Sequence, residues 1–263
     1  MNIIVCLKQV PDTADVKINP ETNTLVREGI KNIINPFDTY ALEEGVRLRE
    51  RFGGRVTALS MGPPQAEPML RETIALGADS AVLLSDRAFA GADTLATSFT
   101  LAQAVKKLAP YDLVICGRQT LDGDTGQVGP EMAEVLGVPF VAYVSEVQEI
   151  SEKEIRVKRM VEDGYEIIES PLPAVISVVK EINTPRLPSL RGQMRAKSAA
   201  VPVWTVRELG VPPEAVGLAG SATKVIKIFY PRRESRAEIL AGAPENQVIS
   251  LLEKLRASGI IPG

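Results

Sequence analysis

Short apolar segments alternate with amphipathic ones over the first 140 residues, and this alternation limits the possible folds more than any other feature of the sequence. The apolar segments are 2–7, 55–61, 81–84 and 113–116. Each is apolar almost throughout, which is typical of parallel strands covered by helices on both faces. Repeated units of strand and helix predict an α/β fold with a doubly wound parallel sheet. Such a sheet binds its ligands beyond the carboxyl ends of its strands.

The segments between these strands contain residues that begin and end helices. Asp38 is expected to cap the first helix and Gly53 to end it. A second helix is expected to begin near Glu67 and to stop at Gly77. The third should begin at a cap formed by Asp93. These helices would cover the sheet.

The second half of the chain has a different pattern. Four short strand-like segments predict an antiparallel hairpin that extends the sheet, and they are 142–149, 154–159, 165–170 and 174–179. Residues 183–202 contain three prolines and four cations without periodicity, so we expect a long surface loop or arm there. The end of the chain contains a strand-like segment, 225–230, and a helix, 244–258.

The composition excludes several kinds of chemistry. The chain contains no histidine, which rules out Ser-His-Asp and Cys-His catalysis and removes the commonest ligand of catalytic zinc. Its two cysteines, Cys6 and Cys116, each lie in an apolar segment, as buried unreactive thiols do. We therefore expect no metal site, and we expect any reactive group to come from a cofactor.

Charge and hydropathy bear on partners and location. The formal net charge is −3, so there is no basic excess to attract nucleic acid or an anionic membrane. No apolar segment approaches the roughly 20 residues that span a membrane. No export signal is visible at the N-terminus. These observations predict a cytoplasmic protein without a membrane span.

The segment 116–130, Cys-Gly-Arg-Gln-Thr-Leu-Asp-Gly-Asp-Thr-Gly-Gln-Val-Gly-Pro, is the most informative candidate for a ligand site. It follows a predicted strand, and its glycines let the backbone approach a ligand closely; they include Gly123, Gly126 and Gly129. Asp124 or Thr125 is expected to cap the helix that leads to residue 136. The free amides of 125–128 would then point at a phosphate, assisted by the helix dipole.

Charged side chains in this segment would have opposite effects on the binding of a phosphate. Arg118 would add a cation to a phosphate site, whereas Asp122 and Asp124 would repel a phosphate placed against them. The two carboxylates fit such a site if they cap the backbone or accept hydrogen bonds from ribose hydroxyls. The segment matches neither the P-loop pattern nor the dinucleotide-binding glycine pattern. A structural turn is an equal alternative to a phosphate site.

Three further loops are expected at the same edge of the sheet, and they are 8–13, 35–38 and 61–64. Taken alone, each is best explained as a turn. Together they would lie at the carboxyl edge of one sheet, where nucleotide sites form.

These segments resemble, in their order along the chain, the β subunit of electron transfer flavoproteins and the similar Fix proteins linked to nitrogen fixation. The matching stretches are 8–12, 35–38, 41–44, 61–64, 77–79, 122–125 and 127–130, together with a hairpin between 157 and 177. The resemblance extends over nearly the whole chain. It implies a fold of the adenine nucleotide alpha hydrolase-like type, a C-terminal arm, and pairing with an α subunit that carries an FAD.

The resemblance also implies which residues hold an adenine nucleotide. The matching positions are Cys6, Asn35, Pro36, Phe37, Asp38, Met61, Asp122, Gly123, Asp124, Thr125, Gly126, Gln127, Val128 and Gly129, and the last stretch continues to Ala133. Leu190 falls at the place of the leucine that anchors partner dehydrogenases in the family's recognition loop. Its neighbours in 188–192 differ from the housekeeping form, and a solvated linker is the alternative for this segment.

The implied domain organisation has three parts. Residues 1–183 would form the nucleotide-binding domain with its hairpin extension, 184–203 the partner-recognition loop, and 204–263 a segment that packs on the α subunit.

Two loops resemble the electron-bifurcating and Fix members of the family more than its housekeeping members. The versions Gln9-Val10-Pro11 and Asp122-Gly123-Asp124-Thr125 are similar to those of electron-bifurcating and Fix members. This similarity implies that the chain binds the ADP part of an FAD. It also implies that electrons pass from NADH to an acyl-CoA-type or other flavin dehydrogenase and to ferredoxin or flavodoxin. A housekeeping carrier with AMP in place of the second FAD is one alternative, and an ATP-binding protein of the same fold without flavin or partner is another.

Overall fold

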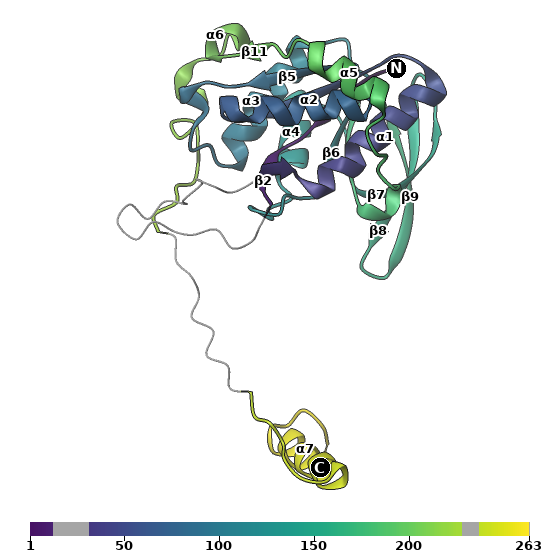
Figure 1. Ribbon diagram of the computed structural model, residues 1–263, viewed down its shortest axis with the longest axis vertical. Coiled ribbons are helices and arrows are strands. Elements are labelled where there is room, and N and C mark those ends of the chain that lie inside the picture. The colour runs from purple at the N-terminus through teal and green to yellow at the C-terminus, as the bar shows by residue number, and fades with distance from the viewer. Residues whose placement is uncertain (13–31, 228–236, 263) are drawn as a thin grey trace. The chain divides into compact units, whose positions relative to one another are not determined.

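A central sheet organises the N-terminal part of the chain in the computed structural model, which describes residues 1–12, 32–227 and 237–262 (Figure 1). The chain divides into two units, Met1–Ile226 and Lys227–Gly263. In the described part of the first unit, the strands across the sheet are, in order, β11 (Val203–Trp204), β5 (Ser80–Leu84), β4 (Arg55–Met61), β1 (Asn2–Cys6), β6 (Leu113–Gly117), β10 (Ala174–Val178), β7 (Phe140–Ile150), β8 (Glu154–Val161) and β9 (Gly164–Pro171). Two short strands, β2 (Gln9–Pro11) and β3 (Asn32–Ile34), pair antiparallel beside it.

The middle of the sheet is parallel and buried on both faces. β1 pairs in parallel with β4 and with β6. The helices that cover it are α1 (Pro36–Phe52), α2 (Glu67–Leu76), α3 (Thr94–Lys107) and α4 (Val128–Leu136). Ile3 and Val5 of β1 pack with α1 and α2, whereas Ile4 and Cys6 pack with α3 and α4. This alternation confirms the predicted doubly wound α/β fold.

The predicted ends of α2 and α3 are confirmed, whereas the predicted cap of α1 is not. α2 begins and ends as expected, and the Asp93 carboxylate caps α3 by accepting a 3.0 Å hydrogen bond from the Ala96 amide. The prediction that Asp38 caps α1 is wrong, because the helix already begins at Pro36 with Asn35 at the cap position. Proline suits this place, since its missing N–H costs no helical hydrogen bond there. Asp38 therefore lies within the first turn.

The predicted hairpin extension is confirmed for three of its four segments. β7, β8 and β9 are antiparallel neighbours at one side of the sheet. The fourth segment, β10, instead returns to the sheet and lies between β6 and β7, parallel to both. Its residues are all buried, so it behaves as a central strand covered on both faces.

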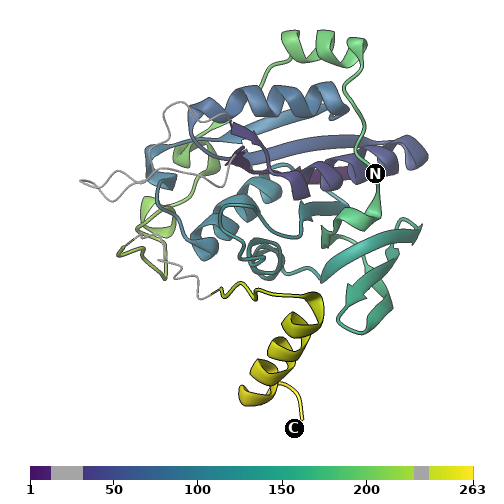
Figure 2. The same cartoon turned by 60° about the horizontal axis from the view of Figure 1, so that its bottom comes forward.

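The segment 183–202 is not the irregular loop predicted for it. It contains α5 (Leu190–Ser198), whose cap Ser189 accepts a 3.0 Å hydrogen bond from the Gly192 amide. α5 (green) packs beside α2 (blue) (Figure 2). The Arg195 guanidinium donates to the carbonyl oxygens of Ile74 and Ala78, both at 2.8 Å, where α2 ends.

Polar contacts and a close backbone approach hold α5, which explains why the sequence showed no apolar periodicity. Of the α5 residues, Ala196 alone is buried. Gly192 lies so near α2 that a Cβ there would come within 2.2 Å of the Ala75 carbonyl oxygen. Arg71 of α2 donates to the Ala199 carbonyl oxygen at 2.7 Å. The helix is therefore fixed by contacts that appear only after folding.

Short elements complete the described chain. α6 (Val206–Leu209) follows β11, which pairs in parallel with β5. The 3-10 helices are η1 (Pro64–Ala66), η2 (Arg87–Phe89), η3 (Lys180–Ile182) and η4 (Pro213–Ala215).

In the second unit, α7 (Pro244–Ala257) confirms the helix expected at 244–258. Of the expected strand 225–230, residues 225–227 are not in a strand, and 228–230 lie outside the described residues.

Within 1–12, 32–227 and 237–262, no helix has both the length and the apolar character that a membrane span requires.

Candidate functional site

The predicted ligand residues converge at the carboxyl edge of the parallel strands. Cys6 ends β1, Met61 ends β4, and the loop 118–127 follows β6. The start of α1 joins them through Asn35, whose side chain is buried. Its Nδ2 donates to the Gln119 carbonyl oxygen at 2.8 Å, and its Oδ1 accepts from the Leu121 amide at 3.2 Å. The structure thus brings together segments that are far apart in the sequence.

Asp38 connects three of these segments through one carboxylate. Its oxygens accept hydrogen bonds from the amides of Lys8 at 2.7 Å and Gly117 at 3.2 Å. Residue 117 must be glycine, because a Cβ there would lie 2.7 Å from the carbonyl carbon of Phe37 and 2.9 Å from the amide nitrogen of Asp38. Burial raises the pKa of Asp38 to about 7, although the hydrogen bonds from Lys8 and Gly117 oppose this change. Both oxygens are engaged by the protein, so Asp38 holds the edge of the site together.

Cys6 and Cys116 are buried neighbours on β1 and β6. Burial raises the pKa of the Cys6 thiol to about 12 and raises that of Cys116 well above its ordinary value. Because the thiolate is the nucleophilic form, neither cysteine is suited to covalent catalysis. The prediction that both thiols are buried is confirmed, and their raised pKa values agree with the expected lack of reactivity.

The loop before α4 offers unpaired backbone donors. α4 begins at Val128 with Gln127 at the cap position and no side-chain cap, so the predicted capping by Asp124 or Thr125 is wrong. In the part of the chain that the structure describes, the amides of residues 125–129 donate to no protein acceptor. Gly126, at φ +64°, shapes this exposed turn. Amides at the start of a helix, at the positive end of its dipole, bind phosphate oxygens.

The acids of the loop have partners within the protein. The Lys8 Nζ lies 2.7 Å from a carboxylate oxygen of Asp122. Partial burial alone would raise the pKa of Asp122, but the hydrogen bond and charge of Lys8 outweigh it and lower the pKa. The Asp124 carboxylate accepts a hydrogen bond from the Gln119 side-chain amide. The repulsion that these acids would exert on a phosphate is thereby reduced.

The other predicted residues contribute apolar surface and packing. Phe37 and Met61 are half-buried at this edge, and Pro36 begins α1. Gly129 is buried, and a Cβ there would lie 3.0 Å from both the Cys116 Sγ and the Phe140 ring. Glycine at 129 therefore allows α4 to pack against the sheet.

The remaining loop residues are accessible or bonded to α3. Gly123 and Thr125 are exposed, and Val128 is half-buried at the start of α4. The Gln127 Oε1 accepts a 3.3 Å hydrogen bond from the hydroxyl of Thr94 on α3. This hydrogen bond joins the cap position of α4 to the first residue of α3.

Sequence reasoning missed two residues of this edge, Gln119 and Tyr143. Gln119 accepts a 2.6 Å hydrogen bond from the Arg118 Nε and so lies between Arg118 and Asp124. The ring of Tyr143 faces Arg118, with 5.5 Å between the ring centre and the guanidinium carbon. Tyr143 comes from β7, far along the chain, and nothing in its local sequence marked it.

The predicted docking residue Leu190 begins α5 and is 81% exposed. Leu187 and Met194 nearby are 88% and 72% exposed. We call these three residues the apolar triplet. Arg186 anchors the preceding chain to α1, because its guanidinium bonds to Glu43 at 2.8 Å and to Glu50 at 2.7 Å. An accessible apolar surface is therefore presented from a segment that ion pairs attach to the sheet domain.

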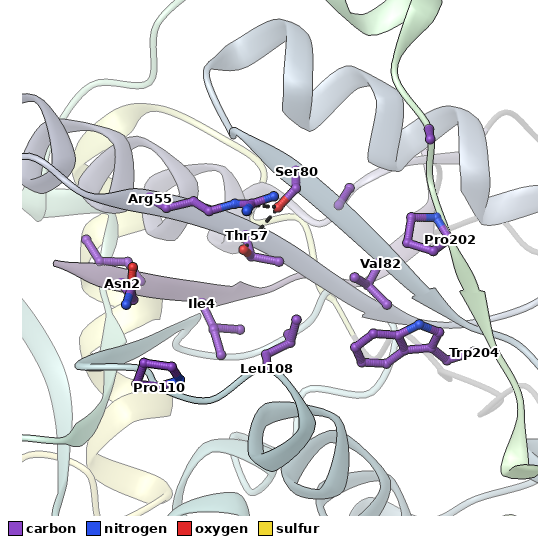
Figure 3. A pocket seen from close by; sticks show the side chains of 13 residues that line it. Asn2, Ile4, Arg55, Thr57, Ser80, Val82, Leu108, Pro110, Pro202 and Trp204 are labelled. Atoms are coloured by element: carbon purple, nitrogen blue, oxygen red, sulfur yellow. Dashed lines mark hydrogen bonds between the residues drawn. The ribbon is translucent and has the colours of Figure 1, made fainter. Parts of the chain in front are cut away.

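A groove of about 470 Å³ lies toward the amino ends of β1, β4 and β5 (Figure 3). Val82, Leu108 and Trp204 form apolar parts of its wall. At its polar end the Arg55 Nε donates to the Ser80 hydroxyl at 3.3 Å. Because the predicted ligand loops follow the opposite ends of these strands, the groove is separate from the candidate site.

The groups at the carboxyl edge suit ligand binding better than acid–base or metal chemistry. Within the described ranges, no three acidic or cysteine side chains gather where a metal ion could be held. Asp38 and Asp122 are engaged by protein donors. The unpaired amides of 125–129 fit the phosphate of a nucleotide, and the apolar side chains of Phe37 and Met61 suit contact with a flat ring.

Several known proteins are similar in sequence to this chain over most of its length. The family model described as the electron transfer flavoprotein domain matches residues 22–209. The electron transfer flavoprotein subunit beta of Thermoanaerobacterium thermosaccharolyticum is 50% identical over 262 residues, which cover 99% of this chain and 100% of that protein. Caffeyl-CoA reductase-Etf complex subunit CarD of Acetobacterium woodii is 48% identical over 263 residues, which cover 99% of this chain and 100% of that protein. Protein FixA of Azotobacter vinelandii is 43% identical over 265 residues, which cover 97% of this chain and 94% of that protein.

Proposed function

Because the chain belongs to the electron transfer flavoprotein family, in its β-subunit and FixA group, we propose that it binds the ADP part of an FAD at the carboxyl edge of β1, β4 and β6. The observation that carries the proposal is the row of unpaired amides at residues 125–129. They would hold a phosphate of the nucleotide at the start of α4.

The residues around this row would position the nucleotide. Asn35 ties the loop after β6 to the start of α1 through its 2.8 Å and 3.2 Å hydrogen bonds. Asp38 holds the exits of β1 and β6 to the same helix. When bound, the FAD supplies the redox chemistry, and the protein supplies position and electrostatics. The raised pKa values of Cys6 and Cys116 agree with a role in which these side chains do not react.

We further propose that the chain works in a heterodimer with an α subunit that carries its own FAD. Electrons would pass from NADH to a dehydrogenase and to ferredoxin or flavodoxin. The bifurcating role is supported by the likeness to CarD, whose name describes a subunit of a caffeyl-CoA reductase-Etf complex. The segment 204–263 would pack on the α subunit, and the exposed apolar side chains Val248, Ile249 and Leu251 of α7 support this.

Residues 184–203 would dock the partner dehydrogenase through the apolar triplet. The exposure of Leu190 supports this role, because large apolar side chains that gather on a surface mark interaction sites. The ion pairs of Arg186 would keep the segment in place before the partner arrives.

Cofactor stoichiometry tests the proposal. The full chain, purified with its α subunit, is denatured, and the released nucleotides are counted. Two FAD and no AMP per heterodimer are expected. One FAD and one AMP would instead indicate a non-bifurcating carrier. A chain that binds ATP without flavin or α subunit would contradict the proposal as a whole.

A further inference from the structure

A strained tyrosine lies at the edge of the candidate site. Tyr143 has a φ of +60°, a left-handed conformation that bulky residues rarely adopt. It sits at a β-bulge, because the register of β7 against β10 shifts between Ile176 and Val178. The Ser177 hydroxyl accepts a 3.2 Å hydrogen bond from the Tyr143 amide there. Bulges re-aim side chains next to ligand sites, and such strain persists where its surroundings enforce it.

The bulge brings Tyr143 to Arg118. The Arg118 amide donates to the Val178 carbonyl oxygen at 3.0 Å, and Val178 pairs with Val144 of β7. Arg118 and Tyr143 therefore lie on either side of the end of β10. The guanidinium carbon is 5.5 Å from the ring centre of Tyr143, which is a cation–π contact. The ring supports the guanidinium without using its N–H groups.

Arg118 remains available to a ligand. Of the five N–H donors of an arginine, the Nε–H alone has an acceptor among the described residues, the Gln119 Oε1 at 2.6 Å. Arg118 forms no ion pair with the acids of that part of the chain, whereas Lys8 is paired with Asp122 at 2.7 Å. Gln119 separates Arg118 from Asp124, because it donates to that carboxylate itself.

Arg118 also borders the unpaired amides of 125–129. Its carbonyl oxygen lies 3.4 Å from the position that a Cβ on Gly126 would take. These amides suit one phosphate, and the planar guanidinium fork suits another. We propose that Arg118, held against the ring of Tyr143, binds the second phosphate of a nucleotide diphosphate and so selects ADP-containing ligands over AMP. This inference rests on the proposed function, because it requires the amides to hold the first phosphate.

Calorimetric titration with ADP and with AMP tests the inference on the full chain in complex with its α subunit, dialysed free of nucleotide. Arg118→Met should lower the affinity for ADP by about 10- to 100-fold, as expected for a lost hydrogen bond to a charged group. The affinity for AMP should stay within about twofold, because the amides of 125–129 remain. Arg118→Lys keeps the charge without the fork and should lose less ADP affinity than Arg118→Met.

Tyr143 is tested as a positioning residue by a matched pair. Tyr143→Leu removes the aromatic face and should lower ADP affinity by about two- to fivefold while AMP affinity is unchanged. Tyr143→Phe keeps the ring and should bind ADP as the wild type does. The Tyr143 hydroxyl has no hydrogen-bond partner among the described residues, so its loss leaves nothing unpaired.

Several results would overturn the inference. It fails if Arg118→Met lowers ADP and AMP affinity equally, or changes neither, in a complex whose thermal unfolding matches the wild type. It also fails if the wild type binds AMP as tightly as ADP, or if Tyr143→Phe loses as much ADP affinity as Tyr143→Leu. Failure of the proposed function itself looks different, because the wild-type complex would then bind neither nucleotide.

Discussion

The buried carboxyl of Asp38 leads to a prediction about stability and pH. Burial raises its pKa from 3.8 to about 7. The folded chain therefore binds this proton more tightly than the unfolded chain does. Asp38 contributes most to stability at low pH, and that contribution is lost as the pH rises from about 4 through 7.

The two pKa values set the size of the effect. Between pH 5 and pH 8, a shift from 3.8 to about 7 changes the free energy of unfolding by about 2.6 kcal/mol. Asp38→Asn removes this titration, so its stability relative to the wild type should be about 2.6 kcal/mol lower at pH 5 than at pH 8. Asparagine also leaves the amide of Lys8 or Gly117 without an acceptor, which costs about 1–3 kcal/mol. That cost does not depend on pH and cancels in the comparison.

Urea unfolding at pH 5, 6, 7 and 8 measures the difference, with the fluorescence of Trp204, the one tryptophan of the chain, as the probe. Asp93→Asn is the control. Burial alone would raise the pKa of Asp93, but hydrogen bonds from Ala96 and Thr223 outweigh it and lower the pKa below 3.8. The contribution of the Asp93 carboxylate to stability is thus lost only below pH 5. The difference in unfolding free energy between Asp93→Asn and the wild type should therefore be the same from pH 5 to pH 8. A destabilisation by Asp38→Asn that is the same at all four pH values, or greater at pH 8 than at pH 5, would refute the raised pKa. It would show that the amides of Lys8 and Gly117 keep the Asp38 carboxylate ionised.

Three further predictions concern the loop and α5. Gly126→Val should lose nucleotide but keep the far-UV circular dichroism of the wild type, because φ +64° disfavours a β-branched residue in this exposed turn; full cofactor content would contradict the site. Leu190→Ala should slow electron transfer to the partner dehydrogenase while flavin content stays unchanged, and equal rates would remove the docking role. Gly192→Ala should loosen α5, because the new Cβ would lie 2.2 Å from the Ala75 carbonyl oxygen. Proteolysis within 183–202 should then become faster, and unchanged protection would disprove the contact.

Local signals in the sequence predicted most of the sheet domain. β4 spans the predicted residues 55–61, and Gly53 and Gly77 follow α1 and α2 as expected. Continuous apolar runs and helix-ending glycines depend on neighbouring residues, so they are visible before folding. The resemblance to a known family then pointed to the segments that converge at the carboxyl edge.

Features that depend on distant partners were missed. The Asp38 carboxylate accepts hydrogen bonds from the amides of Lys8, beyond the end of β1, and Gly117, the last residue of β6, so it does not cap its own helix. α5 is held by Arg195 and by a glycine contact instead of an apolar stripe. The positive φ of Tyr143 arises from the register between β7 and β10. None of these follows from local propensity, because each depends on tertiary contacts.

The structure also resolves the electrostatic conflict that the loop sequence posed. Two aspartates near a phosphate would weaken binding, but Lys8 compensates Asp122 and Gln119 donates to Asp124. The groups that would meet the phosphates are backbone amides and the Arg118 guanidinium. Nucleotide affinity at this edge would therefore depend on the shape of the loop that presents these groups. This makes the turn at Gly126 and the bulge at Tyr143 the points where a small change in the backbone would matter most for binding.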